Sequence, residues 1–123
     1  MAIHQSGEDY LEAILTLQQK KGQVRSVDVA QELGYSKPSV SIAMKKLREQ
    51  GYVRVDEAGL LTLTDEGERL AKSVYERHKT IKRALMLIGV EEADAAEEAC
   101  KLEHAISDST LEKLKAYMEK AEA

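Results

Sequence analysis

Apolar residues recur along the chain in short runs that are separated by glycines and one proline. Between Gly7 and Lys21 they recur at the three- and four-residue spacing of a helix face, and Gly22 follows directly. This pattern predicts an amphipathic helix over residues 7–21 that ends at the glycine.

Two further helical runs lie close together within residues 26–50. Ser26 is placed to cap a helix that ends before Gly34, and Ser36 is placed to cap the next one. Pro38 falls in the first turn of that second helix, where its missing N–H costs nothing. Two helices joined by so short a turn predict a helix-turn-helix. The second helix should bury one apolar stripe, made of Val40, Ala43, Met44 and Leu47.

Residues 52–64 contain two β-prone runs on either side of a polar turn that includes Gly59. This pattern predicts a β-hairpin, and a hairpin that follows a helix-turn-helix is a wing. We therefore expect residues 1–64 to form a winged helix-turn-helix DNA-binding domain.

Helical spacing returns after the hairpin and continues to the end of the chain. It predicts one long helix over residues 65–88, a second over residues 91–106, and a last helix that begins near residue 107 or 109. Ser109 and Glu112 match a capping box at that last start. The predicted fold class is mainly α with a small β-hairpin wing, in which the winged domain is followed by an all-helical dimerisation and metal-binding domain, residues 65–123.

The overall charge argues at first against an indiscriminate nucleic-acid binder. The 123 residues include 18 Lys and Arg against 22 Asp and Glu, a net charge of −4, and the sequence pI is about 5.4. Residues 91–123 carry ten acidic and four basic side chains, a net charge of −6, which leaves residues 1–90 at +2. The acidic excess therefore belongs to the second predicted domain.

Composition also excludes several classes of protein. No apolar run approaches the roughly 18 residues that a membrane span needs, and the N-terminus lacks the basic region and apolar stretch of a secretory signal. A single cysteine, Cys100, excludes an internal disulfide framework. We therefore expect a cytoplasmic protein with no membrane partner.

Positive charge is concentrated in residues 36–54, which hold five basic side chains and one acidic one. Positive charge on the second helix of a helix-turn-helix can pair with the phosphates of double-stranded DNA. Hydroxyls at the N-terminus of that helix can donate hydrogen bonds to phosphate oxygens. Ser36, Ser39 and Ile42 are candidates for reading bases, with Ile42 placed to meet a thymine methyl. The alternative to DNA binding is that these charged residues form the solvated face of an ordinary amphipathic helix, which is the usual role of a single charged residue. The candidate DNA-binding residues are Arg25, Ser36, Lys37, Pro38, Ser39, Ser41, Ile42, Lys45, Lys46, Arg48 and Arg54.

A second group of residues offers metal ligands. Cys100, Glu103 and His104 stand at i, i+3 and i+4 of a predicted helix, a spacing that places them on one face. Mixed O, N and S donors suit a first-row transition ion such as Mn²⁺ or Fe²⁺, and Zn²⁺ is chemically plausible too. The other candidate ligands are Asp9, Glu12 and His78.

Each of these residues also has an ordinary structural role. The cysteine can be a small buried hydrophobe, the histidines can be hydrogen-bonded core residues, and the carboxylates can be solvated helix charges. Two other functions fit the same residues: a metal-independent winged-helix regulator, and a small hydrolase that uses Cys100, Glu103 and His104. The hydrolase lacks an evident orienting group and oxyanion loop.

The chain resembles the metal-dependent repressors of the diphtheria-toxin-repressor and manganese-transport-regulator (DtxR/MntR) family. The resemblance runs nearly end to end and combines the winged helix-turn-helix with the ligand-bearing helices in the family's order. It is carried by Ser6–Ile14 (SGEDYLEAI), Val24–Ala30 (VRSVDVA), Ser36–Val40 (SKPSV) and Glu97–His104 (EEACKLEH).

The resemblance implies a homodimer that binds Mn²⁺ or Fe²⁺, with Zn²⁺ or Co²⁺ as substitutes. Cys100 is the ligand type of the family's iron branch, whereas the carboxylates on the first helix are the pair expected of its manganese branch. Lys82 and Ala96 stand where relatives can have ancillary metal ligands, which implies that a second site is absent or altered. The family ligand positions are occupied by Asp9, Glu12, His78, Cys100, Glu103 and His104.

The resemblance also implies how such a protein would work. One ion held by residues of both domains would favour the arrangement in which the two recognition helices of a dimer lie about one DNA turn, roughly 34 Å, apart. The function expected is repression of metal-uptake genes through a palindromic operator. The chain resembles the short, two-domain form of the family, without a third SH3-like domain.

Overall fold

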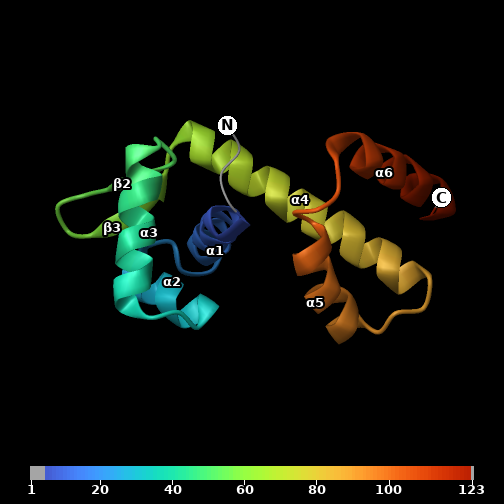
Figure 1. Cartoon of the computed structure of the whole chain (residues 1–123), viewed down its shortest axis with the longest axis horizontal. Helices are drawn as coiled ribbons and strands as arrows, with labels where there is room; N and C mark the ends of the chain where they lie inside the picture. Colours follow the sequence, from blue (N-terminus) through green and yellow to red (C-terminus); the bar gives the residue numbers. More distant parts are fainter. Residues whose placement is uncertain (1–4, 123) are drawn as a thin grey trace. The chain divides into compact units, whose positions relative to one another are not determined.

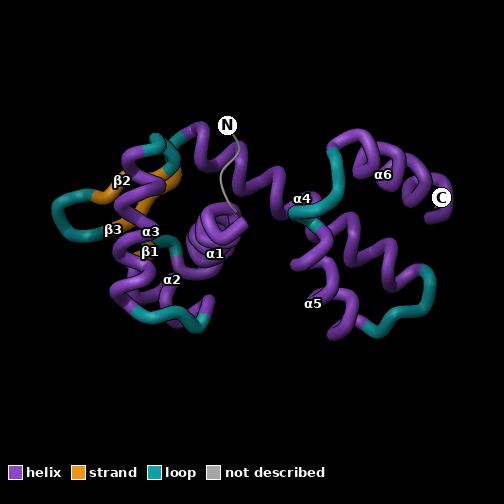
Figure 2. The backbone as a smooth tube through the Cα atoms, in the orientation of Figure 1, coloured by secondary structure: helices purple, strands orange, loops and turns teal. Residues whose placement is uncertain are grey.

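The computed structural model describes residues 5–122 of the chain, which form helices and short strands joined by tight loops (Figures 1 and 2). The described residues divide into two compact units, and the division falls within the longest helix, between Lys72 and Ser73. Residues 1–4, part of the segment expected to lack a secretory signal, lie outside the described residues. The elements are α1 (Gln5–Lys21), β1 (Val24–Arg25), α2 (Ser26–Leu33), α3 (Lys37–Glu49), β2 (Val53–Val55), β3 (Leu60–Leu63), α4 (Asp65–Leu87), α5 (Glu92–Leu102) and α6 (Asp108–Glu122).

The predicted helix-turn-helix is confirmed as α2 and α3. Gly34 ends α2 with a φ of 71°, a left-handed conformation that glycine adopts without strain. The Ser36 hydroxyl accepts a hydrogen bond from the Ser39 N–H at 3.3 Å, so Ser36 caps α3 as predicted.

The predicted cap of α2 is wrong by one residue. Ser26 is the first helical residue, and Arg25 is the cap. The Asp28 carboxylate accepts the Arg25 N–H at 2.9 Å, which satisfies a backbone donor at the start of the helix. Lys21 at the end of α1 donates to the same carboxylate at 2.7 Å, so one side chain joins the two helices.

The predicted hairpin is confirmed as β2 and β3, and it carries a third strand that the pattern did not predict. β1 pairs with β3 in antiparallel register, with Val24 opposite Leu61, and the strand order is β1-β3-β2. β1 is only two residues long, which is too short for an alternating pattern. The sheet and α1 to α3 enclose the core of the first unit, which includes Leu11, Ile14, Val24, Val29, Val40, Val53 and Leu61.

The start of α4 is fixed tightly against the end of α3. The Thr64 hydroxyl accepts the Gly67 N–H at 3.1 Å and donates to the Gly51 carbonyl at 2.6 Å. Gly67 lies so close to Tyr52 that a Cβ there would be 2.0 Å from the Tyr52 carbonyl oxygen. Only glycine fits at this position.

The second unit contains the rest of α4 together with α5 and α6, which pack along it (Figure 1). Its small core joins one side chain from each helix, namely Ile81, Ala99 and Leu111. The last helix begins after Ser107, whose hydroxyl accepts the Thr110 N–H at 3.1 Å. The capping box predicted at Ser109 is therefore wrong. No helix within residues 5–122 has the length and apolar character needed to cross a membrane.

Candidate metal centre and DNA interface

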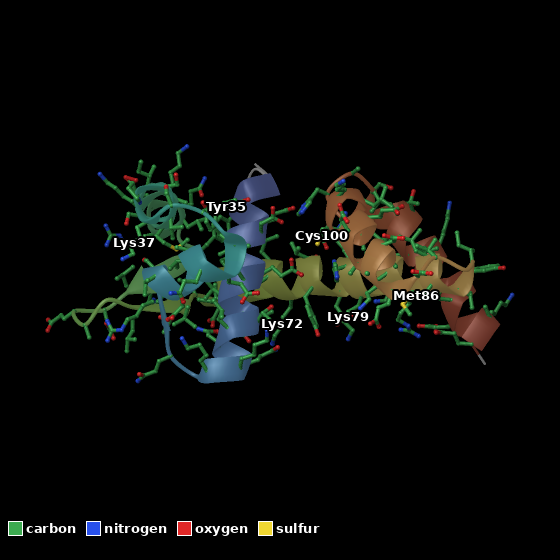
Figure 3. The ribbon with its side chains drawn as sticks, turned by 90° about the horizontal axis from the view of Figure 1, so that it is seen from below. Tyr35, Lys37, Lys72, Lys79, Met86 and Cys100 are labelled. Atoms are coloured by element: carbon green, nitrogen blue, oxygen red, sulfur yellow. The ribbon has the colours of Figure 1, made fainter. Side chains whose placement is uncertain are left out.

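Three predicted metal ligands meet within the second unit. His78 lies in the middle of α4, Cys100 near the end of α5, and Glu103 directly after α5. Donor atoms of these three residues all lie within 4.8 Å of one another. The Cys100 Sγ is 3.7 Å from the His78 Nδ1, and the same nitrogen is 3.4 Å from a carboxylate oxygen of Glu103. Cys100 is labelled in Figure 3.

Helix α5 ends earlier than predicted, at Leu102 instead of about residue 106. Glu103 keeps a right-handed helical conformation, and its N–H still donates to the Ala99 carbonyl at 2.9 Å. His104 follows in the turn, with its Nε2 3.4 Å from the second carboxylate oxygen of Glu103. The helical phase therefore lasts just long enough to bring Cys100 and Glu103 to the same side.

The centre of this cluster is a buried carboxylate. The Glu103 side chain is 1% exposed, and it lies between two histidines that are 19% (His78) and 7% (His104) exposed. Burial, helped by the Lys82 ammonium, lowers the pKa of His78 below its ordinary value. The lowered pKa favours the neutral imidazole, which is the form that binds metal.

The chemistry of these donors fits a divalent transition ion. Ligand atoms about 2.0–2.3 Å from a common ion are separated from one another by about 3–4.5 Å. The distances between His78, Cys100 and Glu103 fall in or close to this range before any rearrangement. A buried carboxylate also gains from a cation that neutralises its charge.

The remaining predicted ligands have different positions. Asp9 and Glu12 lie half-buried on α1, in the first unit, and their part in metal binding stays a prediction. Lys82 is half-buried one turn after His78, with its Nζ 3.8 Å from a Glu92 carboxylate oxygen. The absence or alteration of a second metal site, which the resemblance implies at Lys82, stays a prediction.

One residue near the metal ligands was missed by sequence reasoning. Arg77 sends its side chain into the turn after α5 and donates to the backbone of Glu103 and Ile106. Its spacing carries no signal for this role, because the accepting carbonyls belong to a turn whose position depends on the fold.

The predicted DNA-binding residues of α3 share one exposed surface. Lys37 lies at its start (Figure 3), and Val40, Met44 and Leu47 are buried on the opposite side. Ile42 is 67% exposed, so a large apolar side chain projects from a basic surface. The other exposed members are Ser36, Pro38, Ser39, Ser41, Lys45, Lys46 and Arg48.

The two predicted residues outside α3 belong to the sheet. Arg54 is exposed on β2, in the wing. Arg25 is also exposed, but its guanidinium hydrogen-bonds to the Ala58 carbonyl at the tip of the hairpin. Arg25 therefore has a structural contact that ties β1 to the wing, and a contact with DNA stays a prediction.

Comparison with known protein families identifies both units. The model of the iron-dependent repressor N-terminal DNA-binding domain matches residues 3–59. The model of the iron-dependent repressor metal-binding and dimerisation domain matches residues 64–123. Together these matches span almost all of the chain.

Individual relatives agree with the family models. The chain is 43% identical over 118 residues to an uncharacterised helix-turn-helix-type transcriptional regulator of Methanocaldococcus jannaschii, and the match covers 94% of each chain. It is 34% identical over 113 residues to the transcriptional regulator MntR of Escherichia coli, covering 92% of this chain and 73% of that one.

A solved structure agrees as well. The chain is similar to a manganese-dependent transcriptional repressor in complex with manganese, with a TM-score of 0.84 and 34% identity. This match covers 92% of the chain but only 52% of the solved one, so the chain spans about half the length of that relative. The relatives are transcriptional regulators and not enzymes, which removes the hydrolase alternative. The chain thus belongs to the DtxR/MntR family of metal-dependent transcriptional repressors.

Proposed function

We propose that this protein is a homodimeric repressor that Mn²⁺ or Fe²⁺ activates to bind a palindromic operator in front of metal-uptake genes. The observation that carries the proposal is the cluster around Glu103. Nitrogen, sulfur and carboxylate donors from two helices and a turn come together there around a buried carboxylate.

His78, Cys100, Glu103 and His104 are the ligands we assign within the second unit. Asp9 and Glu12 complete the set in this proposal, which follows from their positions in the family motif. The ion, when bound, supplies a positive charge that offsets the negative charge of its carboxylate ligands. Fe²⁺ gains more than Mn²⁺ from a thiolate, so Cys100 favours iron, whereas the carboxylates favour manganese.

We assign dimerisation to an apolar surface of the second unit. Ile88, which directly follows α4, is 77% exposed, and Leu87 and Leu102 are each almost half exposed. Ile88 and Leu102 line an open apolar groove. In this proposal, the same surface of a second copy of the chain packs into the groove. The groove is lined by Ile81, Ala84, Leu85, Ile88, Leu102, Ala105, Ile106 and Leu114.

DNA binding belongs to α3 and the wing. The N-terminus of α3 presents backbone N–H groups and hydroxyls to phosphates, and Lys45, Lys46 and Arg48 extend the basic surface along the helix. Two copies of α3 in a dimer would enter successive major grooves, roughly 34 Å apart. The exposed Ile42 is placed for apolar contact with a thymine methyl.

The test begins with selection of binding sites from random double-stranded DNA in the presence of Mn²⁺ without oxygen. Gel-shift titration of the selected site then measures affinity with Mn²⁺, Fe²⁺, Zn²⁺ or chelator. We expect a palindromic site, tight binding with metal, weak binding with chelator, and affinity that falls as salt rises. His104→Ala should retain the fold and lose the metal response.

Two results would contradict the proposal. Operator binding that is unchanged by chelator would identify a metal-independent winged-helix regulator. A normal metal response in His104→Ala would show that the ligand assignment is wrong.

A further inference from the structure

The turn that carries Glu103 and His104 is held by one arginine of α4. The Arg77 Nε donates to the Glu103 carbonyl oxygen at 3.1 Å, and its Nη2 donates to the Ile106 carbonyl oxygen at 2.5 Å. Its Nη1 donates to the Asp108 carboxylate at 3.1 Å. One guanidinium therefore contacts two residues of the connection between α5 and α6, a loop that Figure 2 shows, and the first residue of α6.

These three contacts differ in their surroundings. The Arg77 side chain is only 15% exposed, so its bonds to the two carbonyls are largely shielded from water. The Asp108 side chain is 94% exposed, and an ion pair in water contributes little. The two backbone contacts are therefore the ones that fix the turn.

Arg77 precedes His78 directly, and their side chains leave α4 toward the same connection. His78 contacts the Glu103 carboxylate, while Arg77 contacts the Glu103 carbonyl. Two consecutive residues of one helix thus hold the two ends of the same glutamate. The guanidinium suits this task because its donors have a fixed planar geometry, which a lysine ammonium lacks.

We propose that Arg77 is a positioning residue for the metal centre: it fixes the backbone from Glu103 to Ile106 so that the Glu103 carboxylate and the His104 imidazole are ordered before metal binds. This inference rests on the proposed function, because it requires Glu103 and His104 to be ligands. Arg77 is not one of the metal ligands in this proposal. Its loss should weaken metal binding through disorder of the turn.

The variants to compare are Arg77→Met and Arg77→Lys, with Arg83→Met and Asp108→Asn as controls. Arg83 also lies on α4 and bonds to a carboxylate of α6, Glu122, so its loss removes the same charge from the same helix. Asp108→Asn removes only the exposed ion pair. All variants should be studied in the full chain.

Mn²⁺ affinity, measured by titration calorimetry without oxygen, should fall about 10–100-fold in Arg77→Met, the range found when a supporting residue behind a metal ligand is lost. Arg77→Lys should lie between Arg77→Met and the original protein. Both controls should remain within about twofold of the original protein.

Two readouts separate positioning from simple loss of stability. Amide hydrogen exchange of the metal-free protein should rise at residues 103–107 in Arg77→Met and stay unchanged in the core of α4. The visible spectrum of bound Co²⁺ should change in intensity, because it reports ligand geometry, while it stays unchanged in the controls. If Arg77→Met fails to fold, Arg77→Lys carries the same test.

Each outcome has a distinct meaning. If the Arg77 variants bind Mn²⁺ with the affinity of the original protein and give the same Co²⁺ spectrum, the positioning role is overturned and the proposed function still stands. Equal losses in Arg83→Met would overturn it too, because any lost charge on α4 would then suffice. If the original protein binds neither Mn²⁺ nor Co²⁺, both the proposed function and this inference are overturned.

Discussion

Replacement of Glu103 by glutamine should have opposite effects on the stability of the metal-free protein and on metal binding. Glutamine has nearly the same shape, but it carries no charge and is a poor metal ligand. Glu103 is 1% exposed, and burial of a carboxylate costs several kcal/mol that its surroundings must offset. Removal of the charge should therefore leave the metal-free protein equally stable, or stabilise it by about 1–2 kcal/mol.

Metal should then stabilise the original protein far more than the variant. A ligand present at 100 times its dissociation constant stabilises the folded state by about 2.7 kcal/mol. Loss of a direct ligand should weaken binding by at least about 100-fold, since loss of a supporting residue already costs 10–100-fold. At the same Mn²⁺ concentration the variant gains at most about 0.4 kcal/mol. For a chain of this size the difference corresponds to roughly 10 °C in Tm.

The assay is thermal unfolding of both proteins with chelator and with Mn²⁺, monitored by circular dichroism. Glu98→Gln is the matched control, because Glu98 is exposed on α5 and lies outside the ligand cluster. The control should show the full Mn²⁺ shift. Equal Mn²⁺ shifts in Glu103→Gln and the original protein would refute the reasoning, and so would strong destabilisation of metal-free Glu103→Gln.

Three further predictions test other parts of the molecule. Gly67→Ala should destabilise the protein to urea by about 1–3 kcal/mol, because the new Cβ would lie 2.0 Å from the Tyr52 carbonyl oxygen; an unchanged midpoint would contradict this. The hydrogen bond from Lys21 and that from the Arg25 N–H lower the pKa of Asp28, so this carboxylate adds stability at neutral pH that is lost as pH falls through its lowered pKa. Asp28→Asn should thus be less stable than the original protein at pH 7 and equally stable at pH 2, and a constant difference across urea titrations at both pH values would contradict the sign. Ile88→Glu should shift the protein from dimer to monomer in analytical ultracentrifugation, and an unchanged dimer would place the interface elsewhere.

Periodicity predicted most of the fold because each helix buries one face. Val40, Met44 and Leu47 lie on the buried side of α3, and Ser36 caps it, as their spacing indicates. The errors occur where a boundary depends on a contact made elsewhere. Asp28 moves the cap of α2 to Arg25, and β1 exists only because Val24 finds Leu61 on β3.

The metal cluster was predictable in its composition but not in its geometry. The spacing of Cys100 and Glu103 indicated a shared face, whereas the approach of His78 depends on how α4 packs against α5. The end of α5 at Leu102 was missed because Arg77 satisfies the carbonyls of the turn that follows, and no local pattern reports a side chain 26 residues away.

In the proposed function, metal binding and DNA binding are coupled, and such coupling is reciprocal. If Mn²⁺ tightens operator binding, saturating operator DNA must tighten Mn²⁺ binding by the same factor. The direct measurement is the Mn²⁺ dissociation constant, determined by electron paramagnetic resonance of the ion free in solution, with and without the selected operator duplex. We expect the operator to lower this constant about 5–150-fold, whereas a duplex of scrambled sequence should change it far less. An Mn²⁺ dissociation constant that is the same with and without the operator would contradict this coupling.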